Sequence, residues 1–186
     1  FGYMLFVLAG ALLLTLPFAS KSGQSVGFLN ALFTATSSSC VTGLVVLDTA
    51  TSWSIFGQAI IIALIQVGGL GFMTIATMFS IAFKRQIGLR ARLTMVESIN
   101  NDNVGGILSL TKTIVFGTAI IESIGAIILA TRFIPEFGTA KGIWYSIFHS
   151  ISAFCNAGFD LMGGGSLQSF SGDWYVNIIL MVLIIL

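Results

Sequence analysis

The sequence predicts an all-α integral membrane fold, built from tandem repeats of a span, a short helix and a second span. Composition gives the first indication. Hydrophobic residues make up 56% of the 186 residues, charged residues only 8%, and the mean hydropathy is +1.01. A soluble domain carries about 25% charged residues, so lipid must cover part of this chain's surface. The second indication is the order of the segments along the chain. The same series of apolar segments occurs twice, and each series contains one turn that ends in a glycine.

Four long apolar stretches are the candidate membrane spans. A bilayer-spanning helix needs about 20 residues, so the first three stretches are long enough to cross, and the fourth is cut off at Leu186. The chain is therefore expected to be a fragment. Trp53 at the start of the second stretch and Lys84 at its end fit interfacial anchors. The four stretches cover residues 1–18, 49–83, 113–131 and 174–186.

The basic residues predict which side of the membrane each loop occupies. Five of the eight lysines and arginines lie between residues 84 and 112, beside two acidic residues. Because lysine and arginine concentrate in cytoplasmic loops, this segment is placed inside the cell and the two turns outside it. The expected division is a first repeat over residues 1–83, a cytoplasmic basic linker over 84–112 and a second repeat over 113–186.

Two shorter apolar segments, residues 26–38 and 141–154, are too short to cross and are typical of re-entrant helices. Each lies between one span and the next, with its turn on the outer side. The repeat is therefore parallel and not inverted. A shift of 115 residues superposes Gly27 on Gly142, Phe33 on Phe148, Ser37 on Ser152, Cys40 on Cys155 and Gly43 on Gly158.

The first turn, TATSSSCVTG at residues 34–43, places many hydroxyl groups between two apolar segments. Irregular backbone at membrane depth is tolerated only where protein or a water-filled cavity covers it, so two such turns indicate a shared axis with a cavity. Gly43 and Gly158 allow backbone angles that let successive carbonyls point the same way. Such carbonyls, and the negative ends of the short helices, favour a cation. The carbonyls of residues 41–43 are expected to face the ion, and the hydroxyls to hold the turn in shape.

Two motifs resemble the Trk/Ktr/HKT superfamily of potassium transporters. They are QVGGLGF, residues 66–72, and IGLRARLTMVESIN, residues 87–100. The first is more similar to the bacterial Ktr membrane subunit than to Trk, and the resemblance covers essentially the whole chain. It implies four repeats in one polypeptide around a pseudo-fourfold pore, of which this chain holds about two. Glycine at position 43 suits a potassium-selective member, whereas some plant relatives have serine there and carry sodium.

The resemblance implies channel-like potassium uptake through a carbonyl-lined selectivity filter, with sodium as the alternative ion. The second turn, CNAGFD, lacks the hydroxyls of the first, so the sides of the filter are not equivalent. Potassium is the only metal expected at the site. The filter positions that the resemblance implies are Cys40, Val41, Thr42, Gly43, Cys155, Asn156, Ala157 and Gly158.

The resemblance also implies partners. A homodimer in the bacterial plasma membrane is expected, with several spans per subunit, bound to a cytosolic ring of nucleotide-binding RCK domains that gates the pore. Neither a covalently bound cofactor nor a nucleic-acid partner is expected. The gating loop of the family belongs to a later repeat than those in this chain.

A carrier, a membrane scaffold and an enzyme are the alternatives to a pore. A carrier with broken helices would bind a solute at the glycine turns between alternating states, but such carriers often show inverted repeats. A non-transporting scaffold has no evident use for two re-entrant turns. No Ser/His/Asp set, paired carboxylates or metal cluster indicates catalysis, so an enzyme is not expected.

Several further residues have both a functional and a structural interpretation. Glu122, well inside the third stretch, is a functional candidate by default, with a structural hydrogen bond to the neighbours of Ser123 or to another helix as the alternative. Asp160 would concentrate cations at the outer mouth, or be a helix N-cap or a solvated loop residue. His149 is expected to be buried and hydrogen-bonded. Gly68, Gly69 and Gly71 favour close helix packing over a hinge. Arg90 and Arg92 would contact lipid headgroups or the regulatory subunit, and positive-inside bias alone also explains them.

Overall fold

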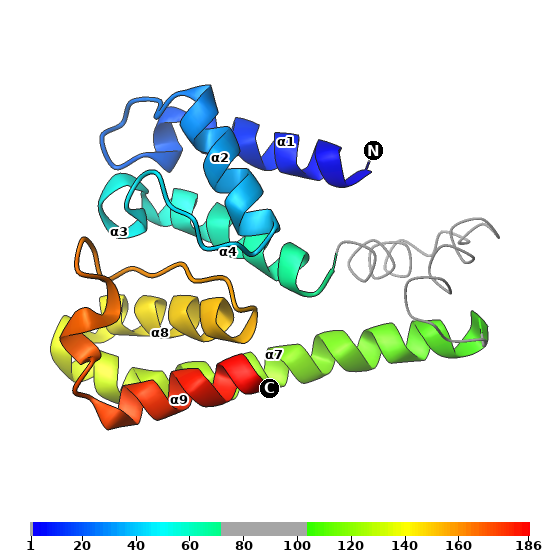
Figure 1. The fold of residues 1–186 in the computed structure, drawn as a ribbon, viewed down its shortest axis with the longest axis vertical. Helices are drawn as coiled ribbons and strands as arrows, with labels where there is room; N and C mark the ends of the chain where they lie inside the picture. The colour runs from blue at the N-terminus through cyan, green and yellow to red at the C-terminus, as the bar shows by residue number, and fades with distance from the viewer. Residues whose placement is uncertain (1, 72–103) are drawn as a thin grey trace. The chain divides into compact units, whose positions relative to one another are not determined.

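The structure, a computed structural model, describes residues 2–71 and 104–186, with side chains in the second range from residue 111 onward (Figure 1). Within these ranges the chain forms helices and turns, and its only strand-like pairing is an isolated antiparallel bridge between Ser20 and Trp53. One compact unit comprises Phe1–Gly69 and Ile121–Leu186, and another comprises Leu70–Ile120. The all-α prediction is confirmed for the described part of the chain.

The helices follow one another in two similar series within the larger unit. In each, an apolar helix is followed by a short helix, a loop without regular structure and another apolar helix. The first series is α1 (Gly2–Thr15), the 3-10 turn η1 (Pro17–Ala19), α2 (Phe28–Ser39), α3 (Thr49–Ser52) and α4 (Ile55–Gly69). The second is α7 (Val104–Phe137), α8 (Thr139–Phe154), the 3-10 turn η2 (Ser166–Phe170) and α9 (Trp174–Ile185).

The helix lengths match the expected spans only in part. One described helix, over Thr111–Phe137, is long and apolar enough to cross a bilayer. The other apolar helices, α1, α4 and α9, are shorter. Helix α1 ends at Thr15 because Pro17 lacks a backbone N–H and fixes the chain in a 3-10 turn. The first stretch thus contains a 14-residue helix and a 3-10 turn, and the second stretch continues past Gly71 into residues outside the described ranges.

Helix α7 begins earlier than the sequence predicts. The third apolar stretch was placed from Thr113, but the helix begins at Val104. The last part of the predicted cytoplasmic linker is thus helical and continuous with the apolar segment. The remainder of that linker, which holds Arg90, Arg92 and the motif at residues 87–100, lies outside the described residues.

Trp53 is a core residue and not an interfacial anchor, which corrects the prediction. Its side chain is completely buried in a cluster formed by α1, α2 and α4. The backbone on either side pairs with the end of α1: Lys21 N–H donates to the Ser52 carbonyl (3.0 Å) and Ser54 N–H donates to the Ala19 carbonyl (2.9 Å). The indole is enclosed beside these two backbone pairings, so it cannot reach a lipid interface.

The two short helices begin at different points of the repeat. Gly27 precedes α2 with φ 83°, and Gly138 precedes α8 with φ 81°. The 115-residue shift instead matches Gly27 to Gly142, which lies inside α8 and packs against the backbone of Ile134. Helix α8 has 16 residues against 12 in α2, so the shift aligns the ends of the two helices and not their beginnings.

An ion pair links Arg132 of α7 to Asp173 at the start of α9. Asp173 caps α9 by accepting from the N–H groups of Tyr175 and Val176, at 3.1 and 3.4 Å. Arg132 of α7 donates to the same carboxylate at 2.6 Å, and this hydrogen bond holds the pKa of the Asp173 carboxyl below its usual value. The loop after the second turn is thereby held between α7 and α9.

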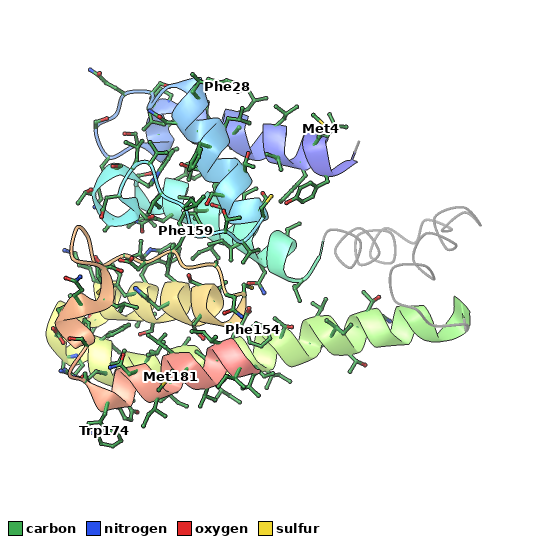
Figure 2. The ribbon with its side chains drawn as sticks, in the orientation of Figure 1. Met4, Phe28, Phe154, Phe159, Trp174 and Met181 are labelled. Atoms are coloured by element: carbon green, nitrogen blue, oxygen red, sulfur yellow. The ribbon has the colours of Figure 1, made fainter. Side chains whose placement is uncertain are left out.

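The outward faces of the helices are strongly apolar, as a lipid-facing surface requires. Met4 on α1 and Trp174 on α9 are 68% and 72% exposed, and both point away from the helices in Figure 2. Large apolar side chains exposed in such numbers on a water-soluble surface would favour aggregation. Further examples are Leu5, Leu12, Ile127, Met181 and Ile185.

Candidate functional site

The two loops that follow α2 and α8 have nearly the same backbone, residue for residue. Val41 and Asn156 both take φ 56°, and Gly43 and Gly158 take φ 71° and 70°. Positive φ is uncommon outside glycine, and for a β-branched residue such as valine it is a true outlier. Strained backbone of this kind costs on the order of 1–3 kcal/mol and clusters at functional sites. The φ angles of the two loops thus match at the positions that the 115-residue shift superposes.

Both short helices end in a Schellman motif, which explains how the left-handed residue is held. Val41 N–H donates to the Ser38 carbonyl (3.3 Å), and Thr42 N–H donates to the Ser37 carbonyl (3.0 Å). The second loop repeats these bonds from Asn156 to Ala153 (3.0 Å) and from Ala157 to Ser152 (2.7 Å). This pair of bonds satisfies the last helical carbonyls and reverses the chain direction. The loop therefore leaves each helix in a fixed direction.

Hydroxyl groups hold the loops from the helix side, as the sequence predicts. The Ser37 and Thr42 hydroxyls lie 2.9 Å apart, and the Ser152 hydroxyl donates to the Phe159 carbonyl at 2.6 Å. Ser38, fully buried, donates to the Thr34 carbonyl at 2.7 Å. Ser37 and Ser152 are the positions that the 115-residue shift superposes, and each bonds to its own loop. Their oxygens are therefore engaged in holding the backbone.

The two loops approach each other at their glycines. A Cβ added at Gly43 would lie 2.9 Å from the Ala157 carbonyl oxygen and 3.2 Å from Gly158 Cα. A Cβ added at Gly158 would lie 3.2 Å from Gly43 Cα. Such contacts are tighter than real Cβ atoms normally make, and backbone is the neighbour in each case. Glycine is thus required at both positions for two reasons: the positive φ disfavours other residues, and the backbone of the other loop leaves no room for a Cβ.

Two glycines of the QVGGLGF motif pack directly against the residues where the two short helices end and the loops begin. A side chain at Gly68 of α4 would collide with the backbone of Ser39, at the end of α2. A Cβ at Gly69 would lie 2.6 Å from Sγ of Cys155, at the start of the second loop. The packing interpretation is confirmed for these two glycines, because backbones approach closely where side chains are absent. Gly71 has φ 81° and lies at the edge of the described residues.

Replacing Gly68 by valine is expected to reduce sharply the amount of folded protein in the membrane. The new side chain must displace the Ser39 carbonyl or push α4 away from α2, and overpacking typically costs about 1–3 kcal/mol. Valine at Gly117 of α7 is the matched control, since a Cβ there meets nothing within 4 Å. Folded protein is measured by fluorescence-detected size exclusion in mild detergent. Equal recovery of the two variants would contradict the packing role.

Glu122 of α7 is buried, with 8% of its surface exposed, and it is bonded to another helix. Gln66 of α4 donates through Nε2 to both carboxylate oxygens, each at 2.9 Å. The Cys155 thiol lies 3.9 Å from Oε1, and the Ser150 hydroxyl of α8 donates to the Glu122 carbonyl at 2.7 Å. The inter-helix hydrogen bond that sequence left as an alternative is therefore present.

His149 and Asp160 hold the segment that leaves the second loop. His149 is 2% exposed, and its Nδ1 lies 2.7 Å from the Tyr145 carbonyl while its Nε2 accepts from Leu161 N–H at 3.3 Å. Since Nε2 accepts, the ring proton is on Nδ1 and the imidazole is neutral. Asp160 accepts from Met162 N–H (2.9 Å) and from the Ser166 hydroxyl (2.7 Å). Asp160 thus caps a loop, and the buried, bonded histidine is as predicted.

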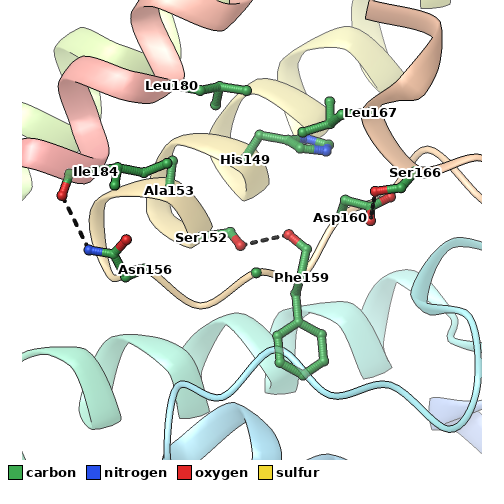
Figure 3. Close-up of a pocket in the computed structure, with 11 residues that line it drawn as sticks. His149, Ser152, Ala153, Asn156, Phe159, Asp160, Ser166, Leu167, Leu180 and Ile184 are labelled. Atoms are coloured by element: carbon green, nitrogen blue, oxygen red, sulfur yellow. Dashed lines mark hydrogen bonds between the residues drawn. The ribbon is translucent and has the colours of Figure 1, made fainter. Parts of the chain in front are cut away.

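A cavity of about 220 Å³ lies behind the second loop, between α8, α9 and η2 (Figure 3). Asn156 closes one end by donating to the Ile184 carbonyl at 3.2 Å. The Phe159 ring points away from the cavity and belongs to the core cluster of the first series. The other lining residues drawn in Figure 3 include Ala153, Leu167 and Leu180.

The sequence analysis missed the polar links between the two series. Trp144 of α8 donates through Nε1 to Oε1 of Gln58 at 2.7 Å, and Gln66 binds Glu122. The available signal was the pair of glutamines itself: both lie in an apolar stretch, about two helical turns apart on α4. Polar side chains inside a membrane segment face partners within the protein.

Side chains alone do not form a metal site in the part of the chain that the structure describes. No group of three or more His, Cys, Asp or Glu residues there could hold an ion.

The chain is similar to known cation transport proteins over nearly its whole length. Residues 5–186 match the family described as "TrkH: Cation transport protein". Identity is 47% over 178 residues with the Potassium/sodium uptake protein NtpJ of Enterococcus hirae, which covers 96% of this chain and 40% of that protein. It is 42% over 184 residues with Ktr system potassium uptake protein B of Bacillus subtilis, covering 99% of this chain and 41% of that protein. The chain thus spans about two fifths of the length of these relatives.

Proposed function

Because the chain belongs to the TrkH family of cation transport proteins, we propose that it takes part in potassium uptake and supplies two sides of a carbonyl-lined selectivity filter. The filter loops are residues 40–43 and 155–158. The family prediction made from the QVGGLGF motif is confirmed by the match over residues 5–186. The proposed activity is transport, without a catalysed reaction.

The observation that carries this proposal is the pair of matching loops. Each takes a left-handed residue directly after a short helix and a glycine with φ near 70° two residues later. The two glycines lie against each other, so both loops reach one place in the fold. A short helix ends at each loop, and the partial negative charge of a helix C-terminus favours a cation nearby.

The proposed architecture has four such repeats around a pseudo-fourfold axis, with this chain supplying two of them. The hydrogen bonds behind each loop support this, because they occupy the hydroxyls of residues 37 and 152 and leave backbone carbonyls as the groups that can face an ion. Rings of backbone carbonyls replace the hydration shell of potassium in selective pores.

The proposed location is the bacterial plasma membrane, crossed several times. The apolar faces of α1, α7 and α9 support a lipid environment, and one described helix has the length of a span. We further propose a homodimer and a cytosolic regulatory subunit with RCK domains. The relative from Bacillus subtilis is named as part of a Ktr system, which supports an assembly with more than one component.

Sodium is the second candidate ion. The relative from Enterococcus hirae is named for both potassium and sodium uptake. The second loop, CNAG, also lacks the hydroxyl side chains of the first, so the two sides of the proposed filter differ. A filter with unequal sides would coordinate potassium, the larger ion, less uniformly. Uptake of both potassium and sodium should therefore be tested.

The test is cation uptake by bacterial cells that lack their own potassium transport and express the complete polypeptide that carries these residues. Wild type is compared with Gly43→Ser at low external potassium, with sodium as competitor. We expect the variant to take up potassium more slowly and to lose its preference for potassium, because serine strains a backbone at φ 71° and meets the Ala157 carbonyl. Unchanged preference, with the variant present in the membrane, contradicts the filter assignment.

A further inference from the structure

Glu122 connects three helices at the level of the second loop. Its carboxylate accepts two hydrogen bonds from Gln66 of α4, both at 2.9 Å. Its backbone carbonyl accepts from the Ser150 hydroxyl of α8 at 2.7 Å. A Cβ at Gly125, one turn further along α7, would lie 2.5 Å from the same Ser150 hydroxyl, so α7 and α8 are in close contact here. The carboxylate is therefore held by α4, and the backbone that carries it is held by α8.

The same carboxylate contacts the first residue of the second loop. The Cys155 thiol lies 3.9 Å from Glu122 Oε1, within the range of a weak sulfur hydrogen bond. On its other side Cys155 packs against Gly69, where an added Cβ would lie 2.6 Å from Sγ. Cys155 is thus fixed between α4 and the Glu122 side chain. It caps α8 and directly precedes Asn156, the strained residue at φ 56°.

The first loop lacks this arrangement. The 115-residue shift that superposes the loops places Val7 at the position of Glu122, so the first loop has an apolar side chain where the second has a carboxylate. The first loop's Cys40 is instead contacted by the Tyr3 hydroxyl of α1, at 3.3 Å. Both loops nevertheless have the same backbone angles. A buried carboxylate is therefore not a requirement of the loop conformation itself, and its presence in one repeat calls for a separate explanation.

We propose that Glu122 is a positioning residue that fixes the second filter loop through Cys155 and thereby sets the preference for potassium over sodium. This inference rests on the proposed function. Glu122 does not contact the ion; it restricts the movement of the backbone from Cys155 to Gly158. Selectivity in carbonyl-lined filters depends on cavity size or on the number and field strength of the carbonyls, and both depend on where the backbone lies.

The experiment measures the ratio of potassium to sodium uptake, per unit of protein in the membrane, in the transport-deficient cells described above. Glu122→Gln is the first variant, because it keeps the size of the side chain but replaces one of the two acceptor oxygens with a donor that faces the Gln66 amide. Glu122→Ala removes the contact with Cys155 as well. We expect the uptake ratio to fall in both, by about tenfold in Glu122→Ala, the scale at which groups behind an ion's ligands act.

An exchanged pair, Gln66→Glu with Glu122→Gln, separates positioning from simple packing. The amide then donates from α7 to a carboxylate on α4, so the link is restored with its direction reversed. We expect the potassium-to-sodium uptake ratio of the exchanged pair to return most of the way from the Glu122→Gln value to the wild-type value. Trp144→Phe is the matched control: it breaks the other polar link between the two series, from α8 to Gln58 of α4, away from the loop, and is expected to leave the ratio unchanged.

The outcomes distinguish this inference from the proposed function. A wild type that prefers potassium, together with Glu122 variants of unchanged ratio, overturns the positioning role alone. A wild type that takes up neither ion overturns the proposed function and this inference with it. The inference is also overturned if the ratio of potassium to sodium uptake falls as far in Trp144→Phe as in Glu122→Ala. General loosening of the helices would then explain the effect.

Discussion

Replacing Gly158 by valine is expected to abolish cation uptake while leaving protein in the membrane. Gly158 has φ 70°, and its Cα faces Gly43 so closely that an added Cβ would lie 3.2 Å from the Gly43 Cα. A left-handed conformation costs an L-residue about 1–2 kcal/mol, and the branched side chain adds the collision with the other loop. Relief requires the two loops to separate, which would destroy any coordination that they share.

Uptake of potassium and of sodium, normalised to the amount of protein in the membrane, checks this expectation. Gly117→Val is the control, since that glycine lies in a helix with nothing within 4 Å of an added Cβ. Gly158→Ala should show an intermediate loss, because it brings the conformational cost with a smaller collision. Uptake by Gly158→Val at the wild-type level would show that the loops do not line the pathway.

Replacing Gln58 by leucine is expected to cause a large loss of thermal stability. Gln58 is 4% exposed and uses its whole amide group. Its Nε2 donates to the carbonyls of Thr49 and Trp53, at 3.3 and 3.2 Å, and its Oε1 accepts from Trp144 Nε1 at 2.7 Å. Leucine fills a similar volume but leaves the indole N–H and two carbonyls without these partners. Each buried polar group left unsatisfied costs about 1–3 kcal/mol, so a total of several kcal/mol is expected.

The measurement is the temperature at which half of the detergent-solubilised complete polypeptide remains monodisperse. Gln24→Leu serves as the control, because that glutamine is exposed in the loop after η1. A double-mutant cycle with Trp144→Phe isolates the link between the two series, and residues in direct contact typically couple by about 0.5–3 kcal/mol. Equal stability of Gln58→Leu and Gln24→Leu would mean that the link contributes nothing to holding the series together.

The parts of the fold that the sequence predicted depend on neighbours along the chain. The sequence predicts the ends of the short helices close to Ser39 and Phe154, because a turn that ends in a glycine follows each apolar segment. The predicted role of the hydroxyls rests on partners such as Thr42 and Ser37, five residues apart. Local signals of this kind can be seen in a single sequence.

The parts that could not be predicted depend on contacts between distant residues. Gln66 and Glu122 are separated by 56 positions, and Gln58 and Trp144 by 86. Nothing in a single sequence pairs one polar residue with another at such distances. Trp53 was misplaced for a related reason, since tryptophan is common both at lipid interfaces and in cores. Its burial follows from the pairing of Ser20 with Trp53, which only the folded chain reveals.

The contact between Gly43 and Gly158 also limits how the two halves of the chain can diverge. The space between them is shared, so a side chain gained in one half uses room that the other half would need. A larger residue at either position meets the backbone of the other loop even while its counterpart is glycine, so the other loop must shift to admit it. The two repeats, although far apart in the sequence, are therefore bound to change in turn and never independently.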